Sequence, residues 1–378
     1  MKKIKVLHCP YNFAGNAMSL VEAERVYGLD SRCAIIEKTA FRFKYDEYFG
    51  SGNFIVRELK RWALFIRSLL TYDIIHFNAG HSLMPDWSQV GEINNPLLRK
   101  IIHIYVRMFV LKDLAIFKKL GKGVVVTYQG DDARQPEYCR KHFKVTFADE
   151  VPESYYNKSY EPFKKWKINE FGKYADRIFA TNPDLLHVLP AKAKFLSYTQ
   201  LMSDDWKPLY PKADKRPPLV VHAPSDRFVK GTKYILMAVE RLKKEGVSFE
   251  FKLVENTPNN KAVELYRKAD LLIDQLLAGW YGKLAVELMA LGKPVIAYIR
   301  QSDLKSIPVD MKKDLPIINA DPETIYTVLK RCVTADRLKL NRLGKQSRLY
   351  VEKWHNSLQV AKVLYHEYKS ILKTKDKV

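Results

Sequence analysis

The loop after a predicted strand at residues 219–223 carries two cations at a spacing suited to phosphate binding. Arg227 and Lys230 lie three residues apart, and a helix is expected to begin at Gly231-Thr232. A guanidinium offers paired donors, an ammonium acts as a point charge, and a helix N-terminus adds backbone N–H groups. The loop could therefore hold a diphosphate, although cations on a loop are also common at solvated surface positions.

A second segment, residues 269–297, has the pattern of strand, glycine-containing loop, helix, tight turn and strand. Such a loop turns backbone N–H groups and a helix N-terminus toward a bound anion. A carboxylate in the first turns of the helix could accept hydrogen bonds from ribose hydroxyls. The candidate residues are Tyr281, Gly282, Lys283, Leu284 and Glu287. The alternative is an ordinary helix that begins with glycine and carries a glutamate.

Polar residues also follow the predicted strands of the N-terminal half. Ligands bind at the carboxyl ends of the strands in parallel sheets, so these residues are candidates for a second binding surface. They are Gly15, Asn16, Asn78, Gln129, Asp131, Asp132 and Arg134. For any one of them, a turn-capping role is an equal alternative.

The elements that must position these residues alternate between short apolar strands and helices. In the first half, strands are expected at residues 4–8, 32–37, 73–77, 123–128 and 177–181. In the second half, they are expected at residues 219–223, 249–254, 271–275 and 294–298. Apolar strands separated by helices predict parallel sheets that are covered on both faces.

The length and one proline-rich stretch predict two domains. The chain has 378 residues, which exceeds one ordinary domain, and residues 207–218 carry four prolines without periodicity. The division predicted is an N-terminal domain at 1–208, a linker at 209–218, a nucleotide-binding domain at 219–345 and a helix at 346–378. That last helix is expected to return to the first domain.

The formal net charge is +22, from 64 Lys and Arg against 42 Asp and Glu, and the excess is spread over both halves. It predicts an anionic partner, which could be a phosphate ligand, anionic lipid or nucleic acid. The four cysteines are scattered, which favours a reducing compartment. No apolar run is long enough to span a bilayer, so a cytoplasmic protein is expected. No zinc-finger spacing, aromatic RNA-binding pattern or basic tail points to nucleic acid.

The 269–297 segment resembles the signature of the retaining glycosyltransferases of the GT-B fold, the branch that includes glycogen synthase and bacterial polysaccharide enzymes. Trp280-Tyr281-Gly282, Glu287 and Gly292-Lys293-Pro294-Val295 fall in register with it. The 227–231 loop is similar to the family's Arg-x-x-x-x-Lys-Gly loop. The resemblance implies two doubly wound Rossmann-like domains facing across a cleft. It also implies that Arg227 and Lys230 hold the donor phosphates and that Glu287 contacts the ribose.

The chain departs from the family pattern at three places. Gly279 occupies the slot of the first glutamate, which holds sugar hydroxyls in relatives, and Asp274 is a candidate substitute that could equally be structural. Gln129 occupies the slot of a sugar-contacting histidine. The segment between Val254 and Ala269 is shorter than in relatives, where this region contacts the base of the nucleotide. The resemblance therefore does not identify the base.

Two basic amphipathic segments, residues 57–70 and 97–122, thread cations through aromatic and aliphatic side chains. Such helices can lie on anionic lipid, and the resemblance agrees because many bacterial relatives act on lipid-linked acceptors. The alternative is a helix whose apolar face packs on its own sheet while its basic face is solvated.

The hypothesis is therefore a glycosyltransferase that moves a sugar from a nucleotide diphosphate sugar to a glycan or lipid-linked acceptor. Cell-surface polysaccharide synthesis at the inner face of the membrane is the expected setting. Retention follows from the resemblance, and metal independence from the lack of an Asp-x-Asp motif; no cofactor besides the co-substrate is expected. Arg227, Lys230, Asp274 and Gln129 are the predicted catalytic residues. The alternatives are a non-catalytic donor-binding subunit and a basic protein that binds lipid or nucleic-acid surfaces.

Overall fold

The computed structural model describes residues 3–38, 43–87, 95–156, 160–200, 202, 206–212 and 216–375. Contacts group the chain into two compact units. Unit 1 is Met1–Arg134, Ser159–Thr199 and Ser357–Val378, and unit 2 is Gln135–Lys158 and Gln200–Asn356. Each unit is therefore built from separate stretches of chain. The linear boundaries given above stay a prediction, and residues 213–215 of the expected linker lie outside the described residues.

Unit 1 contains a seven-stranded sheet in the order β3-β2-β1-β4-β5-β6-β7, and every neighbouring pair is parallel. The strands are β1 (Lys5–Cys9), β2 (Asp30–Ile35), β3 (Glu47–Tyr48), β4 (Ile74–Asn78), β5 (Gly123–Tyr128), β6 (Arg177–Ala180) and β7 (Lys194–Phe195). Strand order reverses at β1, which pairs with both β2 and β4. The carboxyl ends of β1 and β4 thus flank a topological switch point, the usual ligand position in such sheets.

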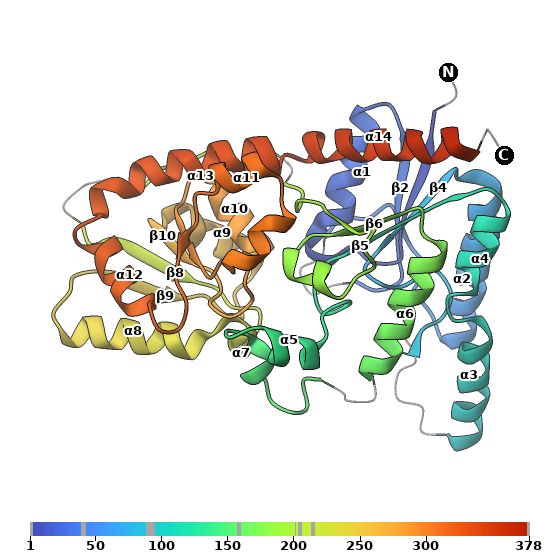
Figure 1. Ribbon diagram of the computed structural model, residues 1–378, viewed down its shortest axis with the longest axis horizontal. Coiled ribbons are helices and arrows are strands. Elements are labelled where there is room, and N and C mark those ends of the chain that lie inside the picture. Colours follow the sequence, from blue (N-terminus) through green and yellow to red (C-terminus); the bar gives the residue numbers. More distant parts are fainter. Residues whose placement is uncertain are drawn as a thin grey trace. The chain divides into compact units, whose positions relative to one another are not determined.

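Helices cover both faces of this sheet (Figure 1). They are α1 (Asn16–Val26), α2 (Phe54–Thr71), α3 (Pro96–Phe109), α4 (Lys112–Lys119), α6 (Tyr160–Tyr174) and α14 (Ser357–Lys375). Successive strand residues point to opposite faces, so Leu7 packs in a core with α2, α3, α4 and α6. Val6 packs in a second core with α1 and α14. Both faces are buried, which explains the near-continuous apolar strands.

Unit 2 contains a five-stranded sheet in the order β12-β11-β10-β8-β9, again parallel throughout. The strands are β8 (Leu219–His222), β9 (Glu250–Leu253), β10 (Leu271–Ile273), β11 (Val295–Ala297) and β12 (Ile318–Asn319). Its helices are α5 (Pro136–His142), α7 (Arg227–Lys230), α8 (Thr232–Lys244), α9 (Asn259–Lys268), α10 (Lys283–Ala290), α11 (Val309–Asp314), α12 (Ile325–Val333) and α13 (Leu340–Trp354). Here the order reverses at β8, between β9 and β10.

The sequence of α8 shows why these helices sit where they do. Ile235, Ala238, Val239 and Leu242 are buried and recur at the spacing of one helix face. They pack with Val220 of β8 and with α12 in the core of unit 2. The polar face of α8, rich in Lys, Arg and Glu, is left to solvent. The predicted doubly wound architecture is confirmed in both units.

The C-terminal tail differs from the single helix expected at residues 346–378. It forms two helices, α13 and α14, which are separated at His355 and Asn356. His355 is fully buried, with Nε2 2.9 Å from the Tyr281 hydroxyl, and its carbonyl accepts a hydrogen bond from the Gln200 backbone at 2.6 Å. These contacts fix the chain at the break. Beyond it, α14 packs against α1 in unit 1 (Figure 1).

Across the described ranges, no helix is both long and apolar enough to cross a bilayer. The four cysteines, Cys9, Cys33, Cys139 and Cys332, are each buried and none forms a disulfide.

Candidate functional site

The predicted phosphate loop and the predicted glycine loop meet at the switch point of the unit 2 sheet. Lys230 follows β8 and Asp274 follows β10, and the Lys230 ammonium lies 3.0 Å from the Asp274 carboxylate. The second oxygen of Asp274 accepts a hydrogen bond from the Gly282 backbone at 2.6 Å. A Cβ at Gly282 would lie 3.0 Å from Lys230 Nζ. Three residues from the two motifs are thus brought into one cluster, which we call the Lys230 cluster.

Local sequence explains how Lys230 reaches this position. The Asp226 carboxylate accepts hydrogen bonds from the backbones of Phe228 and Val229 and so caps the short helix α7. Gly231 then adopts φ +72, a left-handed conformation that favours glycine. A Cβ there would lie 3.1 Å from Leu277. The glycine therefore lets α7 end and α8 begin in contact with the segment after β10.

Gln275 is a member of the cluster that sequence reasoning missed. Its amide oxygen accepts a hydrogen bond from Lys230 Nζ at 2.6 Å, and its amide nitrogen donates to the Trp280 carbonyl. Two of the three donors of the Lys230 ammonium are thus accounted for, by Asp274 and Gln275. The remaining donor of the Lys230 ammonium and the N-terminus of α10 suit a phosphate group, which would have to compete with Asp274 for Lys230 and the Gly282 N–H. The sequence signal that could have identified Gln275 is its position directly after Asp274, at the end of β10.

Arg227 is not part of this cluster. Its guanidinium pairs with Glu255, donating from Nε at 2.7 Å, and its side chain is 57% exposed. The hydrogen bond with Glu255 raises the pKa of Arg227 and lowers that of Glu255. An anion bound by Arg227 would therefore have to compete with Glu255. The predicted donor role of Arg227 stays a prediction.

The first turns of α10 place the other predicted donor residues differently. The Lys283 ammonium donates to the Gln200 side chain at 2.6 Å, and burial lowers its pKa to about 8. Burial raises the pKa of Glu287, against the opposing effect of Lys283 one turn away. Leu284 is half-buried. The side chain of Tyr281 is fully buried, with its hydroxyl 2.8 Å from that of Tyr350, so only its backbone could face a ligand.

Gly279, the position of the missing first glutamate, is covered by Arg300. A Cβ at Gly279 would lie 2.6 Å from Arg300 Cζ, and Gly279 has φ +79. Arg300 is buried, pairs with Asp303 at 2.9 Å and stacks 3.6 Å above the Phe143 ring. No side chain fits at residue 279 without moving Arg300. Asp274, the candidate substitute, is instead bound to Lys230 and Gly282, and its role toward a sugar stays a prediction.

The switch point of unit 1 brings together Asn16, from the start of α1, and Asn78, at the end of β4. Gly15, with φ +69, caps the N-terminus of α1. Asn16 Oδ1 accepts hydrogen bonds from the backbone and hydroxyl of Thr199 at 2.8 and 2.7 Å. Asn78 donates to the His76 carbonyl at 3.3 Å. These contacts use only one end of each side-chain amide.

Several buried polar atoms at this edge have no hydrogen-bond partner within the described residues. They are Asn16 Nδ2, Asn78 Oδ1, Tyr128 Oη and Gln129 Nε2. Buried donors and acceptors are normally satisfied, and each unsatisfied one costs about 1–3 kcal/mol. Tyr128 packs in the core on the opposite face of the sheet, beside Phe171. The amide atoms of Asn16, Asn78 and Gln129 are therefore the ones that point to a polar ligand. Three of the four residues were predicted from the sequence, and Tyr128, the last residue of β5, was not.

The other predicted residues of this edge form a fixed loop. The Asp132 carboxylate accepts hydrogen bonds from the backbones of Gly80, Gln129 and Gly130. The Arg134 guanidinium pairs with Asp131 at 2.7 Å and with Asp184 at 2.8 Å. Asp132 and Arg134 therefore hold the loop after β5 in place, and their predicted contact with an acceptor stays a prediction.

His222 and its surroundings contribute a further feature that the sequence did not indicate. Its ring is buried at the end of β8, with Nε2 2.9 Å from the Thr232 hydroxyl and Nδ1 2.8 Å from the Ile273 carbonyl. Burial lowers its pKa to about 4, so the ring is neutral at pH 7. His222 thus ties β8, β10 and α8 together directly behind the Lys230 cluster.

Both units are doubly wound, as the resemblance implied, and solved structures show the same fold. A sucrose-phosphate synthase from Thermosynechococcus elongatus matches 99% of this chain and all of its own, with a TM-score of 0.63 and 14% identity. Anabaena HepE, solved in complex with UDP, matches 98% of this chain and all of its own, with a TM-score of 0.58 and 11% identity. The fold is that of the GT-B glycosyltransferases.

One solved structure of the same fold is described differently. It is a putative UDP-N-acetylglucosamine 2-epimerase from Listeria monocytogenes, which matches 99% of this chain and 98% of its own, with a TM-score of 0.52 and 12% identity. No family model and no curated protein sequence matches the chain. At these identities the likeness shows the fold, and the reaction must be argued from the site.

Proposed function

We propose that this protein is a glycosyltransferase that uses a nucleoside diphosphate sugar as donor. The observation that carries the proposal is the Lys230 cluster, which joins Lys230, Asp274 and Gly282 at the switch point of the unit 2 sheet. The cluster offers an ammonium and the N-terminus of α10 to an anion. HepE, which has the same fold, was solved with UDP. We propose UDP as the first nucleoside diphosphate to test.

In the proposed reaction, the bond between the sugar C1 and the diphosphate oxygen breaks, and the acceptor oxygen forms the new bond to C1. The proton of the acceptor hydroxyl passes to the departing diphosphate oxygen, and the negative charge that develops on the diphosphate is stabilised by Lys230 and the backbone N–H groups at the start of α10. Glu287 would bind the ribose and Arg227 the outer phosphate, after release from Glu255. We further propose retention of configuration and transfer without a metal ion.

The polar ligand of unit 1 would then be the sugar or its acceptor. Asn16, Asn78 and Gln129 present unsatisfied amide groups, which suit sugar hydroxyls because hydroxyls both donate and accept hydrogen bonds. The proposal assigns Gln129 the place of the sugar-contacting histidine in the family pattern. Asp131, Asp132 and Arg134 would shape that surface through the loop after β5.

The test is a screen of nucleoside diphosphates and their sugars by thermal shift, followed by an assay of nucleoside diphosphate release. At a ligand concentration of about 100 times Kd, a binding site adds about 2.7 kcal/mol to the free energy of unfolding. Lys230→Ala should abolish the shift, and Lys244→Ala, an exposed lysine at the end of α8, should leave it intact. Absence of a shift with every nucleotide, or a shift unchanged in Lys230→Ala, would contradict the proposal.

We also propose that the protein binds an anionic membrane surface through α3, so that a lipid-linked acceptor can be reached in cell-surface polysaccharide synthesis. Five large apolar side chains of α3 are about half or more exposed, namely Leu97, Leu98, Ile101, Ile104 and Met108. The exposed cations Arg99, Lys100 and Arg107 lie on the same helix. Of its apolar residues, only Ile102 and Val106 are buried. A basic helix with exposed apolar side chains suits anionic lipid.

Vesicle flotation tests this membrane contact. The protein should float with vesicles that contain phosphatidylglycerol and remain in solution with phosphatidylcholine alone. Ile101→Glu combined with Ile104→Glu should abolish flotation, while Val363→Glu on the exposed side of α14 should not. Equal flotation with neutral vesicles, or flotation unaffected by the α3 changes, would contradict the contact. The inner face of the membrane is the proposed location.

A donor-binding subunit without transfer activity is the second candidate, and Arg300 is the observation that favours it. Arg300 covers the position where the family pattern has a carboxylate for the sugar hydroxyls. Binding of a nucleoside diphosphate without acceptor-dependent release would support this candidate. Release that depends on an added acceptor would favour the transferase.

A further inference from the structure

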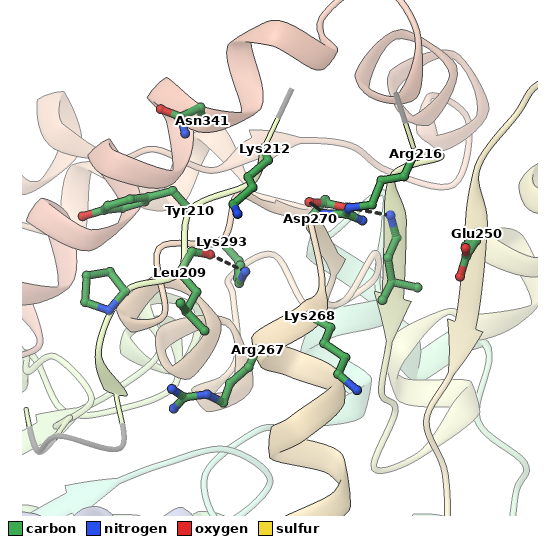
Figure 2. Close-up of a pocket in the computed structure, with 12 residues that line it drawn as sticks. Leu209, Tyr210, Lys212, Arg216, Glu250, Arg267, Lys268, Asp270, Lys293 and Asn341 are labelled. Atoms are coloured by element: carbon green, nitrogen blue, oxygen red, sulfur yellow. Dashed lines mark hydrogen bonds and ion pairs between the residues drawn. The ribbon is translucent and has the colours of Figure 1, made fainter. Parts of the chain in front are cut away.

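A separate pocket of unit 2 lies at the amino edge of its sheet (Figure 2). Its lining includes Leu219 and Glu250, the first residues of β8 and β9, and Asp270, which directly precedes β10. Its volume is about 750 Å³. Because all strands of the sheet are parallel, this edge is opposite to the carboxyl edge that carries Lys230 and Asp274. The pocket, which we call the amino-edge pocket, is therefore distinct from the proposed donor site.

Cations outnumber carboxylates in the lining of this pocket. The cations are Lys212, Arg216, Arg267, Lys268 and Lys293, and the carboxylates are Glu250 and Asp270. Asp270 is already occupied, because Arg216 donates to both of its oxygens at 2.7 and 2.8 Å and the Leu219 backbone donates at 2.8 Å. The other cations, Lys212, Arg267, Lys268 and Lys293, come from three segments of chain that line one cavity.

Lys293 is the buried member of this set, with 2% of the residue exposed. Its ammonium donates to the Leu209 carbonyl (Figure 2). Burial, together with repulsion from Arg216 and Arg267, lowers the pKa of Lys293 to about 8, against the opposing effect of Asp270. Burying an ammonium beside further cations is costly unless an anion compensates them. The turn Gly292-Lys293-Pro294 thus places a buried cation at the pocket, where it also binds the Leu209 carbonyl.

One wall of the amino-edge pocket is apolar. It consists of Pro208, Leu209 and Tyr210. Tyr210 packs close to Gly292, where a Cβ would lie 2.6 Å from its ring. Asn341 anchors the same segment by donating to the Pro211 carbonyl at 2.9 Å. A ligand with a charged group and a compact body would meet cations on one side and an aromatic surface on the other.

We propose that the amino-edge pocket binds a small soluble phosphate monoester, with the phosphate at Lys293 and the body of the molecule against Tyr210. A phosphate dianion accepts hydrogen bonds from several directions, which suits Lys212, Lys293 and the neighbouring Arg267 and Lys268 at the end of α9. The volume suits a molecule the size of a sugar phosphate. This site is independent of the proposed donor site, because it shares none of the residues of the Lys230 cluster.

Titration calorimetry at constant ionic strength, with inorganic phosphate and glucose 6-phosphate as probes, tests the site. Wild-type protein should show saturable binding of both, with the sugar phosphate tighter. Lys293→Met should weaken binding about tenfold or more, since a hydrogen bond from a charged group is lost. Lys268→Glu, at an exposed position, should weaken it severalfold without the risk of misfolding. The control Lys312→Glu, an exposed lysine on α11, should leave binding unchanged.

Further binding measurements distinguish this site from the donor site and from a lipid-binding surface. Lys230→Ala should keep phosphate binding even where it loses nucleotide binding. Sulfate, whose charge is constant between pH 7 and 9.5, should bind more weakly at the higher pH in wild type and show no such change in Lys293→Met. Absence of saturable binding in wild type, unchanged affinity in both Lys293→Met and Lys268→Glu, or binding only to vesicles with phosphatidic acid would overturn the proposal.

Discussion

The carboxyl edges of the two sheets differ in how their polar side chains are paired. In unit 2, Lys230 and Asp274 bind each other, and Asp274 also binds the backbone of Gly282. In unit 1, Asn78 and Gln129 each keep a buried polar atom without a partner in the described part of the chain. The first edge is assembled before any ligand arrives, as electrostatic stabilisation of a phosphate requires. The second edge has hydrogen-bonding capacity that only a ligand would use.

The largest expected change in the free energy of unfolding comes from disrupting the Lys230 cluster at the carboxyl edge of the unit 2 sheet. Asp274→Ala removes the counter-charge of Lys230 and the acceptor of the Gly282 backbone, both in a buried place. The free energy of unfolding should fall by about 3 kcal/mol or more, as for other broken buried pairs. Urea denaturation measures it. As control, Asp310→Ala removes an exposed partner of Lys313 and should cost less than about 1 kcal/mol. Equal losses in the two variants would contradict the comparison.

The next effect concerns the position of the missing glutamate. Gly279→Glu places a side chain against Arg300 in a left-handed backbone, so it should destabilise the protein by about 2–3 kcal/mol. It should not raise transfer activity. Arg300→Ala should remove the steric part of this cost, which a double-mutant cycle in urea would show. A stable Gly279→Glu protein with increased activity would show that Arg300 does not block the position.

At the carboxyl edge of the unit 1 sheet, substitution of a polar side chain should lower activity without lowering the free energy of unfolding. Gln129→Leu removes an amide whose nitrogen has no partner among the described residues, so stability should stay equal or rise by up to about 1 kcal/mol. Activity should fall by about tenfold or more if the amide binds substrate. Asn182→Leu is the matched control, since its amide donates to the Gln129 carbonyl at 2.6 Å and accepts from Tyr198 at 3.0 Å. Loss of stability in Gln129→Leu comparable to that control would contradict the interpretation.

A further effect is a pH dependence at the start of α10. Burial lowers the pKa of Lys283 to about 8, below the value of an unfolded lysine. Between about pH 8 and 10.4 the unfolded state therefore binds more protons at this residue, and this residue makes stability rise with pH. Lys283→Met should reduce that rise in the free energy of unfolding. An identical pH profile in the variant and in wild type would show that Lys283 has no such shift.

The sequence predicted the doubly wound fold because both sheets are built from apolar strands that alternate with amphipathic helices. The short strands β3, β7 and β12, of two residues each, were not predicted. They carry no periodicity of their own, since they are placed by pairing with the neighbouring strand. The break between α13 and α14 was missed for a similar reason. It depends on His355 packing beside Tyr281, which is distant in sequence.

The candidate site was predicted in part. Asp274 directly follows β10, Gly282 precedes α10, and Lys230 ends α7 between β8 and α8, so all three lie at a switch point that sequence order reveals. The partner of Arg227 could not be predicted, because Glu255 follows β9 and meets it only through the sheet. The contact of Arg300 with Gly279 could not be predicted either, since no residue near position 279 indicates which distant side chain packs there.

The central claim is that the Lys230 cluster binds the diphosphate of a nucleotide donor. Titration calorimetry with UDP and with UMP, on wild-type protein and Lys230→Met, tests it most directly. The account predicts that wild type binds UDP more tightly than UMP and that Lys230→Met loses most of this difference. Equal affinity for the two nucleotides in wild type, or a preference for UDP that persists in Lys230→Met, would contradict it.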